Sequence, residues 1–215
     1  MGGPLRLAVL VSGKGSNLAA IVRATEQEGL PATVAVVVSD RAEAAALDWA
    51  RSRGLHTEVL PPQGLDRPAY AERLQQLLER HRPDLIVLAG FMRILDPGFT
   101  ERWSGRILNI HPSLLPALTG LHTHRRALEG GLDRHGCTVH FVTGELDGGP
   151  PVIQASLAVR PGEDEASLSA RVQALEHRIF PEAIGWFAEG RLEMRAGSAW
   201  LDGQRLKSPV MREAS

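Results

Sequence analysis

Residues 5–17 read LRLAVLVSGKGSN, and this stretch decides the fold class. Its first seven residues are apolar apart from one arginine, which is typical of a strand buried on both faces. A glycine-rich turn follows, and the apolar residues from Leu18 onward predict a helix that ends near Gly29. The order of strand, glycine-rich turn and helix predicts the first repeat of a parallel α/β sheet.

The turn in this stretch brings together groups that suit an anion. A helix that starts after a glycine-rich turn presents free backbone N–H groups and the positive end of its dipole. Ser16 and Asn17 add side chains that cap helices and donate hydrogen bonds. Leu18 occupies the place of the third glycine of a dinucleotide fingerprint, and the turn is not a P-loop either. Two interpretations stay open, a phosphate-binding loop and a tight turn without a ligand.

The alternation of strands and helices continues through the first half of the chain. Apolar runs predict strands at residues 33–39, 56–60 and 84–89. Amphipathic stretches predict helices at residues 42–53 and after Asp66, which is a good N-cap. Because successive βα repeats cross over with one hand, we expect a doubly wound, mostly parallel, Rossmann-like sheet with helices on both faces.

The second half predicts an antiparallel contribution to the α/β fold. Residues 136–143 alternate between two faces, and residues 152–159 form another predicted strand. Residues 164–179 form an amphipathic helix that Pro181 should disturb. We expect a short strand and a polar tail after residue 191.

Length and composition point to one globular domain. The 215 residues suffice for a substantial core, so we expect a single domain over residues 1–215 with a flexible tail at about 208–215. The 24 basic residues nearly balance the 25 acidic ones, which argues against a nucleic-acid partner. The sequence lacks the apolar run of about 18 residues that a membrane helix needs. We therefore expect a cytoplasmic protein with no membrane or nucleic-acid partner.

The single cysteine limits redox and metal chemistry. Cys137 excludes an internal disulfide and a thiolate metal cage. In the alternating strand it shares a face with Val139 and Phe141. We expect it to be packed in the core and not to act as a nucleophile.

A second decisive stretch is residues 106–116, which read RILNIHPSLLP. It predicts a short buried strand that ends at a proline, since proline cannot continue a ladder. Side chains alternate along a strand, so Asn109 and His111 should emerge on the same side, at the carboxyl end. In open α/β sheets that edge is where ligands bind. A packed core histidine beside a turn asparagine is the alternative interpretation.

The sequence offers two other candidate sites, a metal site made of histidines and a serine nucleophile. The histidines that invite a metal site are His122, His124, His135, His140 and His177. Because no carboxylate or cysteine stands at ligand spacing, we expect no metal, and we expect His122 and His124 on a loop and helix start beside the site. Ser113 lies on a proline-flanked loop unlike the strand-to-helix elbow of serine hydrolases.

The remaining group is Asn109, His111 and Asp147, an acid on a glycine-rich loop. Such a group needs no covalent nucleophile if the attacking substrate is an amine. An α-amino group has a pKa of about 8, so a useful fraction is neutral at pH 7. The enzyme would then mainly stabilise a tetrahedral oxyanion and move a proton.

These residues also carry a family resemblance. Residues 109–116 (NIHPSLLP), followed by residues 147–149 (DGG), resemble the folate-dependent formyltransferases. Residues 12–17 (SGKGSN), 88–95 (LAGFMRIL) and 120–124 (GLHTH) resemble the branch of that family that acts in purine synthesis. The resemblance runs from about Leu5 to Gln204 and consists of several blocks in the same order.

The resemblance implies transfer of a formyl group from 10-formyltetrahydrofolate to the amine of 5-phosphoribosylglycinamide, by direct attack through a tetrahedral intermediate. It implies that Asn109 holds the formyl oxygen, that His111 donates a proton and stabilises the oxyanion, and that Asp147 orients and charges the imidazole. Both substrates are small molecules, the folate is a cosubstrate and no metal takes part. The protein would be a monomer or a homodimer.

The resemblance also implies two binding regions. The residues that match contacts to the phosphoribosyl substrate are Gly15, Ser16, Asn17 and Glu176. The residues that match the folate pocket are Arg67, Met92, Arg93, Ile94, Leu95, Asn109, Thr143, Gly144 and Asp147. Lys14 occupies a variable place in the phosphate loop, where its cation should strengthen phosphate binding. Residues 117–119 (ALT) replace a stretch that often reads lysine, aromatic residue, proline in the family.

Three other functions would explain part of this sequence pattern. A 10-formyltetrahydrofolate hydrolase is the main alternative, although such proteins usually carry an extra N-terminal domain for which we expect no room before Leu5. A methionyl-tRNA formyltransferase would need a further C-terminal domain and a basic surface. A phosphosugar-binding protein without catalytic activity would explain residues 13–17 and would leave Asn109, His111 and Asp147 without a role.

Overall fold

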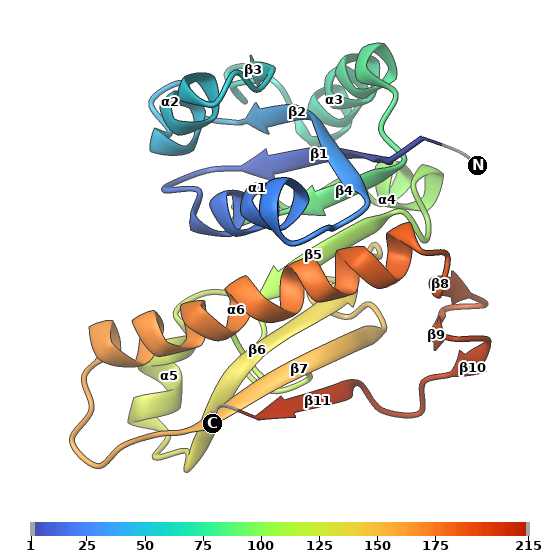
Figure 1. Cartoon of the computed structure of the whole chain (residues 1–215). Helices are drawn as coiled ribbons and strands as arrows, with labels where there is room; N and C mark the ends of the chain where they lie inside the picture. The colour runs from blue at the N-terminus through green and yellow to red at the C-terminus, as the bar shows by residue number, and fades with distance from the viewer. Residues whose placement is uncertain (1–2, 214–215) are drawn as a thin grey trace. The chain divides into compact units, whose positions relative to one another are not determined.

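The structure is a computed structural model that describes residues 3–213. The chain divides into two compact units, Met1–Asn109 and Ile110–Ser215, and Figure 1 shows the elements of each. The boundary lies inside strand β5 (Ile107–His111), so this strand belongs to both units. A single formyltransferase domain over residues 1–215 stays a prediction.

The first unit contains a parallel sheet with strand order β5-β4-β1-β2-β3. Its further strands are β1 (Leu5–Val11), β2 (Ala32–Ser39), β3 (Thr57–Val59) and β4 (Leu85–Leu88). Leu7 to Val11 are fully buried, as expected of an apolar strand covered on both faces. Strands β2 and β3 lie on one side of β1, and strands β4 and β5 lie on the other side. The order therefore reverses between β1 and β4, and this reversal is a topological switch point, where α/β proteins bind ligands.

The helices of the first unit are α1 (Ser16–Gln27), α2 (Ala45–Ser52), α3 (Arg67–His81) and α4 (Pro97–Arg102). Helix α3 begins where expected, because the Asp66 carboxylate accepts a hydrogen bond from the Ala69 N–H at 2.9 Å. Helix α4 was not predicted. It is a short helix after Asp96, whose carboxylate accepts from the N–H groups of Gly98 and Phe99, with Pro97 as its first residue.

The second unit contains the predicted antiparallel strands. Strand β6 (Arg134–Phe141) pairs antiparallel with β7 (Pro151–Ala158), and β11 (Val210–Glu213) pairs parallel with β7. Helix α6 (Glu165–Ala188) lies along β6 and β7, while α5 (Thr123–Glu129) is short (Figure 1). A small antiparallel sheet has the order β10-β9-β8. Its strands are β8 (Leu192–Arg195), β9 (Ser198–Leu201) and β10 (Gln204–Arg205).

Two expectations for the second unit need correction. Helix α6 runs without a break through Pro181, because buried apolar neighbours such as Phe180 and Ile184 hold this turn in place. The predicted flexible tail contains strand β11, which is stabilised by main-chain pairing with β7 and not by local propensity. Residues 214–215 of that tail lie outside the described residues.

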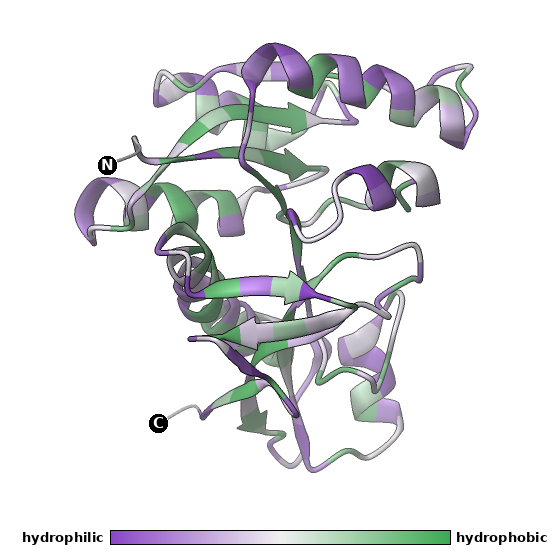
Figure 2. Cartoon of the chain, turned by 90° about the vertical axis from the view of Figure 1, so that its right-hand side faces the viewer, coloured by the Kyte–Doolittle hydropathy of each residue, from purple (hydrophilic) through white to green (hydrophobic). Residues whose placement is uncertain are grey.

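Hydropathy follows the layers of both units. Figure 2 shows hydrophobic colour concentrated on the strands, while turns of the helices alternate between hydrophobic and hydrophilic colour. This pattern matches helices that pack one face on a sheet and expose the other.

Candidate active site

The predicted phosphate turn lies at the carboxyl end of β1, at the switch point. Gly15 adopts a left-handed conformation with φ of 79°, and α1 begins at the next residue. A Cβ atom on Gly15 would come within 2.6 Å of the Cβ of Ala46. Glycine is therefore required here both for its backbone angle and for its close approach to α2. Ser16 and Asn17 open the helix, so their backbone N–H groups point toward its amino end.

Ser12 joins this turn to the predicted folate segment at the end of β4. Its N–H donates to the Gly90 carbonyl at 3.1 Å, and its hydroxyl accepts from the Met92 N–H at 2.9 Å. The same hydroxyl donates to the buried carboxylate of Asp40 at 2.6 Å. One serine thus holds residues 90–92 against the start of the phosphate turn. The sequence predicted both segments without showing that they are fastened together.

The predicted folate residues of the first unit differ in exposure. The side chains of Met92 and Ile94 are exposed, whereas Leu95 is buried and packs in the core. The guanidinium of Arg93 lies 4.4 Å above the ring of Tyr70 in a cation–π contact. Tyr70 lies one turn after Arg67, so helix α3 and residues 92–95 are neighbours. Burial raises the pKa of the Tyr70 hydroxyl well above its usual value, which keeps this group neutral.

Asn109 and His111 both lie in β5, separated by one residue, as the sequence predicted. Asn109 pairs in register with Leu88 of β4 and is half-buried. His111 is the last residue of the strand and is buried. Since Asn109 pairs with the last residue of β4, it lies at the carboxyl edge of the first unit's parallel sheet.

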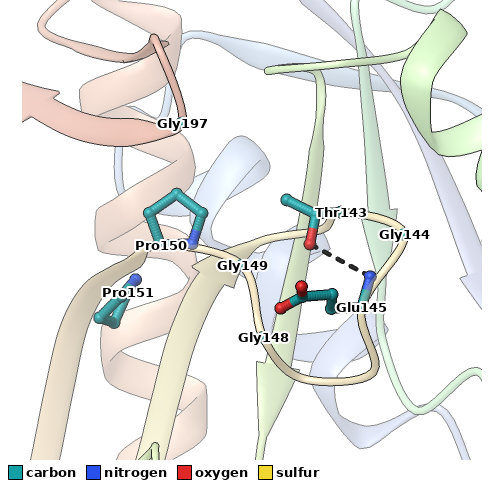
Figure 3. A pocket seen from close by; sticks show the side chains of 8 residues that line it. All are labelled: Thr143, Gly144, Glu145, Gly148, Gly149, Pro150, Pro151 and Gly197. Atoms are coloured by element: carbon teal, nitrogen blue, oxygen red, sulfur yellow. Dashed lines mark hydrogen bonds between the residues drawn. The ribbon is translucent and has the colours of Figure 1, made fainter.

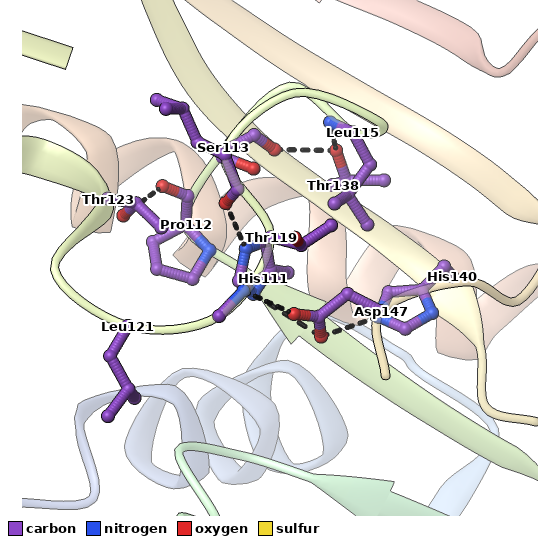
Figure 4. Close-up of polar contacts among 12 residues, drawn as sticks. His111, Pro112, Ser113, Leu115, Thr119, Leu121, Thr123, Thr138, His140 and Asp147 are labelled. Atoms are coloured by element: carbon purple, nitrogen blue, oxygen red, sulfur yellow. Dashed lines mark hydrogen bonds and ion pairs between the residues drawn. The ribbon is translucent and has the colours of Figure 1, made fainter. Parts of the chain in front are cut away.

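In the second unit the Asp147 carboxylate lies between two imidazoles, as Figure 4 shows. Its Oδ1 atom is 3.6 Å from Nδ1 of His111 and 4.0 Å from Nε2 of His140. All three side chains are more than nine-tenths buried, so little water screens the charge of the carboxylate. Asp147 itself has φ of 52°, which directs the loop so that its carboxylate faces His111.

His140 is a neighbour of the site that the sequence analysis did not assign. Its Nδ1 donates to the carbonyl of Phe141 at 2.9 Å. Burial lowers the pKa of His140, so this ring is neutral at pH 7 beside the carboxylate. The available signal was strand alternation, which places His140 on the opposite face of β6 from Cys137.

The loop that follows His111 in the chain contacts both His111 and Asp147. Nε2 of His111 lies 2.9 Å from the carbonyl oxygen of Leu118, and the N–H of Gly120 donates to Oδ2 of Asp147 at 2.8 Å. Closer to His111 in the sequence, the same loop is held by Thr138 of β6. The Thr138 hydroxyl donates to the Ser113 carbonyl at 2.6 Å and accepts from the Leu115 N–H at 3.1 Å (Figure 4). The peptide bond between Leu115 and Pro116 is cis.

The predicted folate residues Thr143 and Gly144 border a surface hollow of about 510 Å³ (Figure 3). The residues that line it are Thr143, Gly144, Glu145, Gly148, Gly149, Pro150, Pro151 and Gly197. The Glu145 N–H donates to the Thr143 hydroxyl at 3.4 Å, which shapes the loop that leads to Asp147. Six of the eight lining residues are glycines or prolines, so few polar side chains face this hollow.

Glu176 and Cys137 occupy the interior of the second unit. Glu176 lies in α6 and is 8% exposed. Cys137 is fully buried, and burial raises the pKa of its thiol, with the charge of Glu176 adding to the shift. The prediction that Cys137 is packed in the core is confirmed.

His124, near the start of α5, and His135 of β6 form a pair. Nδ1 of His124 lies 3.1 Å from Nε2 of His135, with the rings edge to face. Burial lowers the pKa of His135 to about 4 and also lowers the pKa of His124. Two protonated rings at this distance would repel each other, so the contact requires at least one neutral ring. Among residues 3–213, no group of three potential metal ligands from histidine, cysteine and acidic side chains comes together.

The described part of the chain contains no helix that is long and apolar enough to cross a membrane.

Residues 5–184 match the model of the formyl transferase family. The chain is 51% identical over 203 residues to the phosphoribosylglycinamide formyltransferase of Escherichia coli, with 94% of this chain and 96% of that protein covered. It is 43% identical to the corresponding enzyme of Haemophilus influenzae, with 94% and 95% covered. The chain therefore belongs to the formyl transferase family and, within it, to the phosphoribosylglycinamide formyltransferases.

Solved structures agree with this membership. The phosphoribosylglycinamide formyltransferase of Coxiella burnetii superposes with a TM-score of 0.93 and 45% identity, covering 97% of this chain and 99% of that chain. A formyltetrahydrofolate deformylase of Pseudomonas syringae gives a TM-score of 0.86, covering 93% of this chain and 66% of that one. Its identity is only 22%, so it shares the fold alone.

Proposed function

We propose that this protein transfers a formyl group from 10-formyltetrahydrofolate to the primary amine of 5-phosphoribosylglycinamide in purine biosynthesis. The observation that carries the proposal is the buried Asp147 carboxylate 3.6 Å from the imidazole of His111, at the end of a central strand. The relatives at 51% and 43% identity bear the name of this activity. Both substrates are small molecules, and the cytoplasm is the compartment in which we expect the protein.

The reaction needs a positioned proton donor more than a nucleophile. The substrate amine attacks the formyl carbon, a new C–N bond forms, and the carbonyl oxygen becomes an oxyanion. Collapse of this tetrahedral species breaks the bond to N10 of the folate. The amine loses a proton and N10 gains one, so the transfer is balanced without an oxidant or a metal. Stabilising the oxyanion and moving this proton are the tasks left to the protein.

We assign these tasks to three residues. Asn109 holds the formyl oxygen through its amide N–H, a hydrogen bond that strengthens as negative charge develops. His111 donates the proton and stabilises the oxyanion with its positive charge. Asp147 favours the charged imidazole, because a carboxylate this close and this buried stabilises a cation.

We assign the binding regions from the family resemblance of the sequence. The turn with Gly15, Ser16 and Asn17 binds the substrate phosphate, since a glycine-rich turn before a helix presents N–H groups to an anion. Lys14 adds a cation to that turn. Glu176 contacts the phosphoribosyl substrate. The residues assigned to the folate are Arg67, Met92, Arg93, Ile94, Leu95, Asn109, Thr143, Gly144 and Asp147.

The main alternative function is hydrolysis of 10-formyltetrahydrofolate, in which water replaces the amine. One assay separates the two reactions, the absorbance change on deformylation of 10-formyltetrahydrofolate with and without phosphoribosylglycinamide. Turnover that requires the amine supports the transferase. Equal turnover without the amine would instead establish a hydrolase, and binding without any turnover would establish a binding protein. Light scattering of the purified protein distinguishes the two assembly states that we consider, a monomer and a homodimer.

A further inference from the structure

We propose that Arg126 is a positioning residue for formyl transfer, because it holds the loop whose Leu118 carbonyl orients the imidazole of His111. This inference rests on the function proposed above. Arg126 lies in the last turn of α5, and its hydrogen bonds go to carbonyl groups of the loop. It acts through the loop of residues 118–121.

Four hydrogen bonds attach the loop, through its peptide groups 118–119, 119–120 and 121–122. The Leu118 carbonyl accepts from His111, and the Gly120 N–H donates to Asp147. Between and beyond these contacts, Nη1 of Arg126 donates to the Thr119 carbonyl at 2.6 Å and to the Leu121 carbonyl at 3.4 Å. A guanidinium carries five donors and no acceptor, so one Arg can hold two carbonyl groups.

The backbone of this loop requires such support. Leu118 has φ of 55° and His122 has φ of 58°, and both lie in the left-handed region that residues other than glycine rarely adopt. A non-glycine residue in this region persists only where its surroundings hold it. Arg126 fastens the carbonyl groups that lie between the two strained positions. Without it, this segment would lose its main side-chain attachment on the α5 side.

The contact with the Leu118 carbonyl fixes the tautomer of the neutral His111 ring. A carbonyl oxygen only accepts hydrogen bonds, so Nε2 of His111 must carry the hydrogen in the 2.9 Å contact. The neutral ring then has its lone pair on Nδ1, which faces Asp147 at 3.6 Å. A second proton can bind only at Nδ1, beside the Asp147 carboxylate. If the loop were released, the two tautomers of the neutral ring would compete.

Arg125 provides a matched control. It is adjacent in α5 and exposed like Arg126, but its Nε atom pairs with Glu165 at 3.1 Å instead of holding the loop. The titratable groups that act on His111 are Asp147, His140, His124 and His135. Neither arginine substitution removes any of them.

The first measurement is made on the full chain without ligands, so it is independent of activity. In protein labelled with ¹⁵N-histidine, the His111 resonances are assigned with a His111→Asn variant and recorded at high pH, where the ring is neutral. We expect the Nε2–H tautomer in wild type and in Arg125→Ala, and a mixture of both tautomers in Arg126→Ala. The same tautomer in all three proteins would overturn the proposal, even if the protein proved to have another activity.

The second measurement is steady-state turnover. Loss of a charge-assisted hydrogen bond should lower the kcat of Arg126→Ala by about tenfold. The KM for phosphoribosylglycinamide should stay within about threefold, since the phosphate turn is unchanged. Arg126→Lys should recover part of the kcat, because an ammonium group can hold one of the two carbonyls. Equal kcat values for Arg126→Ala and Arg125→Ala, with melting temperatures that match, would contradict the proposal.

Discussion

Oδ1 of Asp147 lies 3.6 Å from Nδ1 of His111, and both side chains are more than nine-tenths buried. This separation is too long for a hydrogen bond, and the two side chains form a buried ion pair when the imidazole is protonated. The other carboxylate oxygen, Oδ2, accepts from the Gly120 N–H at 2.8 Å. Asp147 therefore acts on the imidazole through its charge and on the loop through a hydrogen bond.

Replacing Asp147 by asparagine separates these two effects. The amide oxygen of Asp147→Asn can still accept from Gly120, but the negative charge beside His111 is gone. We expect kcat at pH 7 to fall on the order of 100-fold, because the charged imidazole is no longer favoured. Dissociation constants for both substrates should change little, which isothermal titration calorimetry can measure. A variant that keeps wild-type turnover would make Asp147 a residue of loop structure only.

The amide of Asn109 should contribute to the transition state and not to ground-state binding. Asn109→Ala removes the proposed donor to the formyl oxygen. Loss of one such donor lowers turnover by about 100-fold or more, since its hydrogen bond strengthens as charge develops. Steady-state kinetics should show a large loss in kcat with a small change in KM. If KM rises while kcat is preserved, Asn109 has a binding role instead.

The phosphate turn should not tolerate a side chain at Gly15. In Gly15→Val the added Cβ would approach Ala46 within 2.6 Å at a left-handed backbone angle. We expect the KM for phosphoribosylglycinamide to rise at least about tenfold, because the N–H groups of the turn are displaced from the phosphate. The affinity for the folate should be retained.

Gly29→Ala is the control for backbone strain. Gly29 has φ of 77°, but a Cβ atom there would meet no atom within 4 Å. Its substitution should cost on the order of 1 kcal/mol of stability and leave both KM values unchanged. If Gly15→Val and Gly29→Ala behave alike in kinetics, the turn does not bind the substrate phosphate.

The histidine pair His124 and His135 should make stability depend on pH. Their pKa values in the folded protein are lowered, to about 4 for His135, below the ordinary value of about 6.5 that applies to the unfolded chain. Between these values the unfolded chain binds more protons than the folded protein. The contribution to stability is therefore fully present above about pH 6.5 and is lost as the pH falls toward 4.

Urea unfolding at pH 7.5, 6.0 and 5.0 measures this effect. A single shifted histidine can change the free energy of unfolding by up to about 1.4 kcal/mol per pH unit within that window. His135→Gln should reduce the pH dependence, because glutamine does not titrate. Exposed His56 serves as the control, and His56→Gln should leave the dependence unchanged. A wild-type protein with equal stability at all three pH values would refute the prediction.

The sequence by itself determined the fold class and indicated the residues to which we assign the chemistry. Alternating apolar runs and helical periodicity are local patterns, so β1, α1 and β2 lie within a few residues of their predicted bounds. The strand that contains Asn109 and His111 ends before Pro112, since proline removes the N–H that a ladder requires. Blocks of residues in family order indicate the formyltransferases from the sequence alone.

The tertiary structure alone decided how these segments are held. The bridge from Ser12 to Met92 spans 80 residues, and the Asp147 carboxylate approaches His111 and His140 from a separate loop. Strand β11 forms because β7 offers an unpaired edge, and α6 continues through Pro181 because buried neighbours hold that turn. Local patterns cannot specify such contacts, because their free energy comes from groups that the chain brings together only when it folds.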